Sequence, residues 1–132
     1  MGIISDYIGA APSIFSALIL QSLSIFSLSV ISVTESTYLI LASLIGFGFG
    51  GNFVLFAKET AQVFGVDKLG IVYPYVFMGY AFAGVFGPIS GGYLYDISGS
   101  FLYAIILASF MSLMGSLLFL PQILSRQNVN DK

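Results

Sequence analysis

The chain has 132 residues, of which 58% are hydrophobic and only 8% are charged, and its formal net charge at pH 7 is −2. A soluble domain carries about 25% charged residues, and a soluble chain this short could not bury so much apolar surface. Composition therefore excludes an ordinary soluble domain and predicts a protein that lies in a lipid bilayer.

Several kinds of chemistry are excluded by residues that the chain lacks. It contains no cysteine and no histidine, which removes disulfides, thiolate chemistry, histidine bases and the usual zinc ligands. We therefore predict no catalytic residue, no metal site and no cofactor, and we expect that the protein is not an enzyme. Four basic residues are too few for a nucleic-acid interface.

Charged residues divide the chain into four long uncharged runs. A helix needs about 20 apolar residues to cross a bilayer, and the runs are continuous rather than alternating, as the strands of a barrel would be. We predict an all-α integral membrane protein, a single polytopic segment over 1–132 with a short cytoplasmic tail at 123–132. The four transmembrane helices are expected near 11–33, 37–57, 70–95 and 100–122.

The first predicted helix is rich in hydroxyl groups, with seven serines between Ser13 and Ser32, and it also carries Gln21. We interpret these side chains as donors to their own backbone or to a neighbouring helix. A transport role for Gln21 is the alternative.

The second predicted helix contains one amide, Asn52. Asn52 is a candidate substrate contact, and a hydrogen bond to another helix is the alternative. The stretch "GFGFGG" at 46–51 formally matches a dinucleotide-binding motif, but it lies inside an apolar span with no strand before it, so we discount it. The charged residues that follow are interpreted as a solvated loop: Lys58, Glu59, Asp67 and Lys68.

The third predicted helix carries the second candidate substrate contact, Tyr80, a hydrogen-bonding group near the middle of the membrane. A hydrogen bond to another helix is again the alternative. Pro88 removes the hydrogen bond to the carbonyl of Gly84, which suits either a moving interface or a static kink. The residues assigned to hinge and packing are Gly79, Ala83, Gly84, Gly87, Pro88, Gly91 and Gly92.

Small residues recur every four positions on three of the helices, where they would let backbones approach closely or form static seams. The ladders are Gly79/Ala83/Gly87/Gly91, Ala42/Gly46/Gly50 and Ala104/Ala108/Ser112/Ser116. After the third helix, Asp96 is expected in a turn closed by Gly99, with Ser98 or Ser100 capping the last helix.

The basic residues all fall on one side of the predicted membrane: Lys58, Lys68, Arg126 and Lys132. The positive-inside rule then places both termini in the cytoplasm. We expect a multi-pass protein of the cell membrane.

Two stretches resemble a known family. "GIISDYIG" resembles the G-x-x-S-D-x-x-G loop of major facilitator superfamily carriers, which assigns Gly2, Ser5, Asp6 and Gly9 to that motif. "LGIVYPYVFMGYAFAGVFGPISGGYLYDISGSF" is similar to the eleventh helix and following turn of the oxalate/formate antiporter group. Several of those carriers hold an anion-binding lysine where this chain has Tyr80.

The resemblance implies that the chain corresponds to helices nine to twelve of such a carrier, a partial C-terminal bundle. The first and last helices would be outer supports, the second would face the translocation path, and the third would line the contact between the two halves. The implied function is that of a C-terminal fragment of an alternating-access secondary transporter for a small metabolite, with small anions among the candidates.

Such a fragment is not expected to transport alone. Its expected partners are the lipid bilayer, a separate chain that supplies the missing helices or a homo-oligomer, and a small-molecule substrate once assembled. The alternative function is that of a small tetraspan protein that binds or assembles other membrane proteins.

Overall fold

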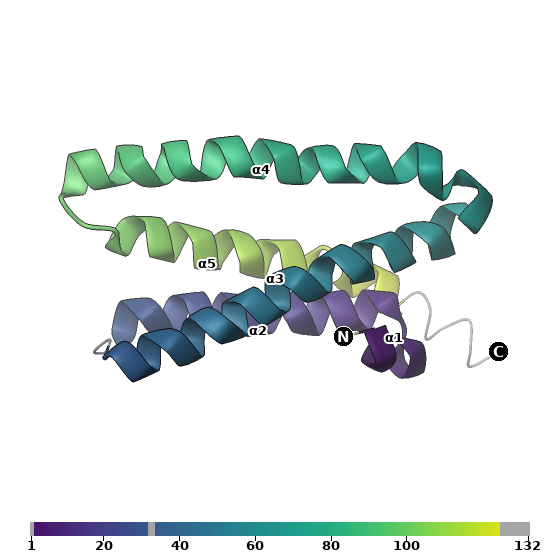
Figure 1. Ribbon diagram of the computed structural model, residues 1–132, viewed down its shortest axis with the longest axis horizontal. Coiled ribbons are helices and arrows are strands. Elements are labelled where there is room, and N and C mark those ends of the chain that lie inside the picture. Colours follow the sequence, from purple (N-terminus) through teal and green to yellow (C-terminus); the bar gives the residue numbers. More distant parts are fainter. Residues whose placement is uncertain (1, 32–33, 125–132) are drawn as a thin grey trace.

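The computed structural model of the chain describes residues 2–31 and 34–124, and every regular element in that part is a helix. A short helix α1 (Gly2–Ile8) comes first, and the 3-10 turn η1 (Val66–Lys68) precedes the third long helix (Figure 1). The long helices are α2 (Ala10–Val30), α3 (Glu35–Phe64), α4 (Leu69–Ser98) and α5 (Leu102–Leu117).

Four helical stretches are long and apolar enough to cross a membrane, namely Ala10–Val30, Glu35–Phe64, Val66–Ser98 and Leu102–Leu124. The predicted all-α fold with four membrane spans is therefore confirmed. The predicted end of the first span at 33 and most of the predicted tail, 125–132, lie outside the described residues.

Helix α3 extends beyond the predicted range 37–57. It begins at Glu35 because Thr34 caps it, with Thr34 Oγ1 accepting a hydrogen bond from the Thr37 N–H at 3.3 Å. It ends at Phe64 and is followed by Gly65, which has a φ of 85°. The interpretation of Lys58 and Glu59 as loop residues is wrong, because charge marks the edge of the apolar span while lysine and glutamate remain good helix formers.

Helix α2 is the central helix of the described bundle, since α1, α3 and α5 all pack against it. Its Ile14 and Ala17 are fully buried together with Leu55 of α3. The backbones of α2 and α3 come close at Gly48, where a Cβ atom would lie 3.6 Å from the Ala17 carbonyl oxygen. Within this part of the chain, α2 is therefore more enclosed than the outer support that the family resemblance implied.

Serine side chains join α2 to α5. Ser22 Oγ donates to the Ser109 carbonyl at 2.8 Å, and Ser112 Oγ donates to the Leu18 carbonyl at 3.1 Å. Other serines of α2 bond their own helix, as Ser24 Oγ does to the Leu20 carbonyl at 2.8 Å. Both arrangements predicted for these hydroxyl groups are thus confirmed.

Helix α4 packs less closely than the other long helices, along the upper side of the bundle in Figure 1, and it contacts α3 and α5. None of its residues is buried. It is tied to α5 by the turn between them, where the rings of Tyr95 and Phe101 stack with centroids 4.4 Å apart. Much of the α4 surface is therefore open to lipid or to further protein.

The turn from α4 to α5 follows the prediction in part. Gly99 ends α4 in the left-handed conformation with a φ of 69°, and its N–H donates to the Tyr95 carbonyl at 2.7 Å. Ser100 Oγ accepts from the Leu102 N–H at 3.2 Å, but the N-cap position of α5 is Phe101, which makes no side-chain capping bond. Asp96, however, lies in the last turn of α4 rather than in the connection, because the helix continues to Ser98.

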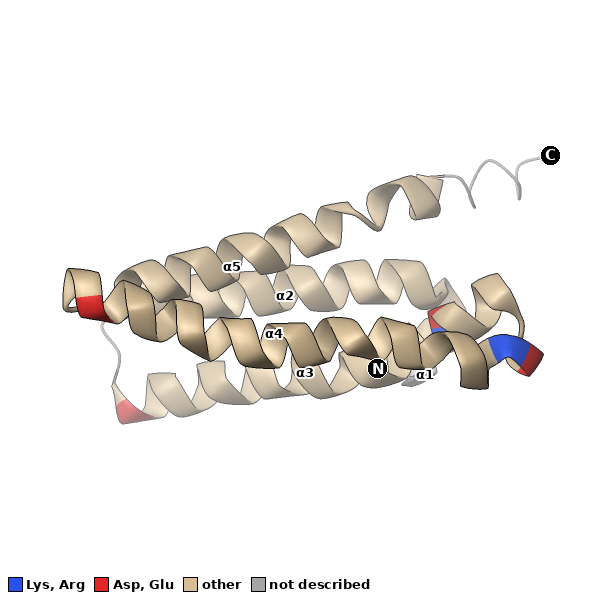
Figure 2. Ribbon diagram, turned by 90° about the horizontal axis from the view of Figure 1, so that it is seen from above, with Lys and Arg blue, Asp and Glu red and all other residues tan. Residues whose placement is uncertain are grey.

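The charged residues gather at the two ends of the bundle. Figure 2 shows only acidic positions at one end, and basic together with acidic positions at the other. The first end holds Glu35 and Asp96, where α3 begins and α4 ends, and the second holds the start of α4 with Asp67 and Lys68. The uncharged stretch of α3 between Glu35 and Lys58 is long enough to cross the hydrocarbon core of a membrane.

Candidate functional site

Aromatic side chains of α3 and α4 pack into one cluster near the middle of the two helices. Phe49, Phe53 and Phe56 are spaced four and three residues apart, so they share one face of α3. Tyr80 of α4 stacks on Phe53 with ring centroids 4.8 Å apart and meets Phe49 and Phe56 edge-on at 6.4 and 6.1 Å. Phe77 completes the set, 5.6 Å from Phe53 and 5.5 Å from Tyr80. We call these five residues the aromatic cluster.

The two tyrosines that face α3 differ in their hydrogen bonds. The Tyr73 hydroxyl donates to the Phe53 carbonyl at 3.1 Å, which ties α4 to α3. The Tyr80 hydroxyl has no hydrogen-bond partner among residues 2–31 and 34–124. Tyr80 is only partly exposed, so its ring is held in place while its polar atom stays available.

A groove of about 470 Å³ opens beside the aromatic cluster between α3 and α4. We call it the aromatic groove, and its lining is Phe49, Phe53, Phe77, Tyr80, Ala81, Ala83 and Gly84. Its size falls within the range of about 300–1,000 Å³ that small-molecule sites occupy. Tyr80 contributes the one polar side-chain group of this lining.

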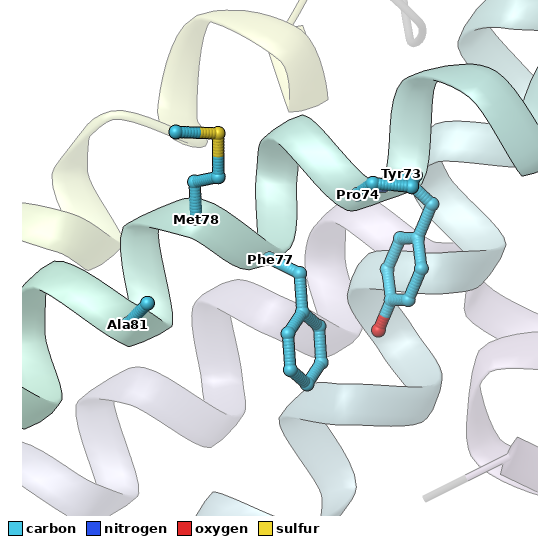
Figure 3. Close-up of a pocket in the computed structure, with 5 residues that line it drawn as sticks. All are labelled: Tyr73, Pro74, Phe77, Met78 and Ala81. Carbon is cyan, nitrogen blue, oxygen red and sulfur yellow. The ribbon is translucent and has the colours of Figure 1, made fainter.

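A second hollow of about 490 Å³ lies along α4 itself and shares Phe77 and Ala81 with the aromatic groove. Figure 3 shows the rings of Tyr73 and Phe77 projecting from α4 to the same side, while Met78 points away from them. Pro74 completes its lining. The two hollows are therefore neighbours on the N-terminal half of α4.

Asn52 is not part of this site. It is 4% exposed and faces α2, where its Nδ2 donates to Gln21 Oε1 at 3.3 Å. Its neighbours along the seam are Gly48 and Leu55, which lie on a different face of α3 from the phenylalanines. The structure thus separates the two predicted substrate contacts, and Asn52 takes the helix-to-helix arrangement that the sequence left as the alternative.

The residues assigned to a hinge have few neighbours in the described chain. A Cβ atom added at Gly79, Gly84, Gly87 or Gly92 would meet nothing within 4 Å, whereas at Gly91 it would meet the Ala104 side chain at 3.9 Å. Helix α4 continues through Pro88 without interruption. Of this group, Ala83 and Gly84 line the aromatic groove.

The motif at residues 2–9 forms the short helix α1 rather than a loop, and it ends at Gly9, which has a φ of 91°. Ser5 is buried, and its hydroxyl accepts a hydrogen bond from Lys58 Nζ at 3.0 Å. Lys58 also forms an ion pair with Asp6, with Nζ and Oδ1 2.5 Å apart. Helix α3 thus supplies a cation to the motif, which has no basic residue directly after Gly9.

Sequence reasoning did not single out Phe49, Phe53 and Phe77 as site residues. Spacing of four residues between Phe49 and Phe53 was the available signal, yet α3 is apolar on every face, so spacing alone could not show which face meets α4. In residues 2–31 and 34–124, no three Asp or Glu side chains come together in a way that could hold a metal ion.

These features define a multi-pass membrane protein with an open aromatic groove between α3 and α4. The family model of the Major Facilitator Superfamily matches residues 1–130, and the chain therefore belongs to this family of membrane transporters. Neither a search of curated proteins nor a search of solved structures finds a match.

Proposed function

We propose that the chain forms helices nine to twelve of a secondary transporter that moves a small metabolite by alternating access. In such carriers one bundle rocks against another around a site near the middle of the membrane. Membership of the family supports the transport function. The specific position within a carrier is supported by the resemblance of residues 2–9 and 69–101 to the corresponding stretches of oxalate/formate antiporters.

The observation that carries the proposal is that three of the four spans pack closely together while the fourth is exposed. Helices α2, α3 and α5 share a seam with buried residues and interhelical hydrogen bonds, whereas α4 has no buried residue. The exposed helix also contributes Tyr80 and most of the lining of the aromatic groove. In a complete carrier, the other half of the protein would cover this exposed face of α4 and the Tyr80 hydroxyl.

The same packing argues that the chain does not transport alone. Carrier sites lie between repeated halves, and the aromatic groove is walled by α3 and α4 only. We propose that its partner is a chain or segment that supplies the remaining helices. The orientation with both termini in the cytoplasm belongs to this proposal and rests on the charge pattern at the two ends.

The test is uptake into proteoliposomes. The chain alone is compared with the chain joined to whatever apolar helices are encoded directly upstream of it, using labelled oxalate, formate and a neutral solute as substrates. We expect uptake by the joined protein and none by the chain alone. Uptake by the chain alone at the same rate would contradict the need for further helices, and no uptake by the joined protein would favour the assembly protein instead.

A further inference from the structure

We propose that the aromatic groove binds a neutral, flat aromatic solute whose ring packs on the aromatic cluster and whose oxygen accepts a hydrogen bond from Tyr80. This inference rests on the proposed function, because it names the substrate class of that carrier. It differs from the small anions that the family resemblance suggests.

The shape of the groove favours a ring. Phe53 and Tyr80 are stacked with an angle of 18° between their planes, and Phe77 is tilted by 42° from Phe53. Aromatic pairs prefer offset stacking or edge contacts at about 4.5–7 Å between centroids. A flat ring that enters the groove can therefore stack beside Phe53 and Tyr80. Ala83 and Gly84 also line the groove, and their small size leaves room for the ring.

The hydroxyl of Tyr80 favours a solute that carries an oxygen acceptor. This hydroxyl has no partner among the described residues, and a polar group without a hydrogen bond is costly where water is excluded. A lipid acyl chain could fill the groove but has no acceptor to offer. A carbonyl or ether oxygen on the solute would satisfy the hydroxyl and fix the orientation of the ring.

Charge argues for a neutral solute. No basic residue lies between 69 and 125. Lys58 follows Phe53 by five residues on α3, but its ammonium group is paired with Asp6 of α1. A carboxylate in the aromatic groove would lose its hydration without gaining a cation, which is expensive at this depth. The aromatic groove therefore discriminates against small dicarboxylates by leaving them unpaired.

Benzophenone tests the inference directly, because it is neutral and aromatic, carries one carbonyl acceptor and forms covalent bonds to nearby side chains under ultraviolet light. The full chain in lipid nanodiscs is labelled, and the attached residues are located by mass spectrometry. We expect saturable labelling at Phe53, Phe77 or Tyr80 that acetophenone displaces and dodecane does not. Equal displacement by dodecane would show a groove for lipid chains and would overturn the inference.

Substitutions in α3 and α4 distinguish labelling in the aromatic groove from labelling elsewhere on α4. Tyr80→Phe keeps the ring and removes the hydroxyl, so we expect about five-fold weaker half-saturation. Phe53→Ala removes the stacking partner and should abolish labelling at Tyr80. Phe82→Ala is the matched control, because Phe82 lies outside the aromatic groove, is 59% exposed and contacts Phe86 instead; its labelling should equal that of the unchanged chain. Unchanged half-saturation in Tyr80→Phe would also overturn the inference.

The labelling result and the transport result can fail separately. Saturable labelling with no uptake by the joined protein would leave the binding site standing and remove the transport function. Uptake without labelling of the aromatic groove would leave the carrier standing and overturn the aromatic substrate class.

Discussion

The role of a polar side chain inside an apolar bundle depends on its hydrogen-bond partners. Asn52 bonds Gln21 across the seam between α2 and α3, whereas the Tyr80 hydroxyl forms no hydrogen bond with a described residue. The sequence identified both residues as unusual, because an amide or a hydroxyl in a long apolar run needs a partner. It could not assign the partners, since those depend on the direction that each residue faces around its helix.

The hydrogen bond between Asn52 and Gln21 should contribute measurably to stability. We expect Asn52→Ala to lower the free energy of unfolding by about 1 kcal/mol, the upper part of the range for such bonds in membranes. Unfolding by sodium dodecyl sulfate in mixed micelles, followed by circular dichroism, measures the change. In a Gln21→Ala background, Asn52→Ala should lower the free energy of unfolding by less than it does in the unchanged chain.

Ser43→Ala is the matched control for this prediction. Ser43 lies on the same helix, but it is exposed and bonds only the Leu39 carbonyl of its own backbone. Its replacement should leave the unfolding curve unchanged. Strictly additive effects of Gln21→Ala and Asn52→Ala would show that the two side chains do not interact.

Packing of whole helices was only partly predictable. The sequence indicated that glycines would mediate close contact, but the ladder proposed on α3 was Ala42/Gly46/Gly50, and the close approach to α2 occurs at Gly48. Glycines occur on several sides of α3, and lipid is as apolar as the neighbouring helices, so no hydrophobic face marks the buried side. Only the three-dimensional arrangement distinguishes the seam from the other faces.

A larger side chain at Gly48 should force α2 and α3 apart. An added Cβ atom there lies 3.6 Å from Ala17 and Gln21 atoms, so Gly48→Ala fits, whereas the branched end of Gly48→Leu meets the backbone of α2. We expect Gly48→Leu to destabilise the chain by about 1–3 kcal/mol, measured by the same detergent unfolding. Gly50→Leu is the control, since nothing lies within 4 Å of that position. Equal losses of stability in Gly48→Leu and Gly50→Leu would contradict a close contact between α2 and α3 at Gly48.

At the scale of the whole molecule, the number and length of the spans followed from the sequence because the membrane imposes them. Long uncharged runs must become helices in lipid, where every backbone group needs an internal partner. The central place of α2 and the looser packing of α4 did not follow, because they depend on side-chain fit between helices. The aromatic groove is a product of that fit, which explains why Tyr80 was identified from the sequence and its phenylalanine partners were not.

The orientation of the whole chain in the membrane can be tested with single cysteines, since the chain has none of its own. Ser98 lies exposed at the acidic end and Lys68 lies exposed at the basic end. Because basic residues are retained on the cytoplasmic side, Ser98→Cys should react with an impermeant maleimide in intact cells. Lys68→Cys should react only after the membrane is permeabilised. The unchanged chain provides the unlabelled control. If Lys68→Cys is labelled in intact cells and Ser98→Cys is not, the orientation is the opposite of the one predicted.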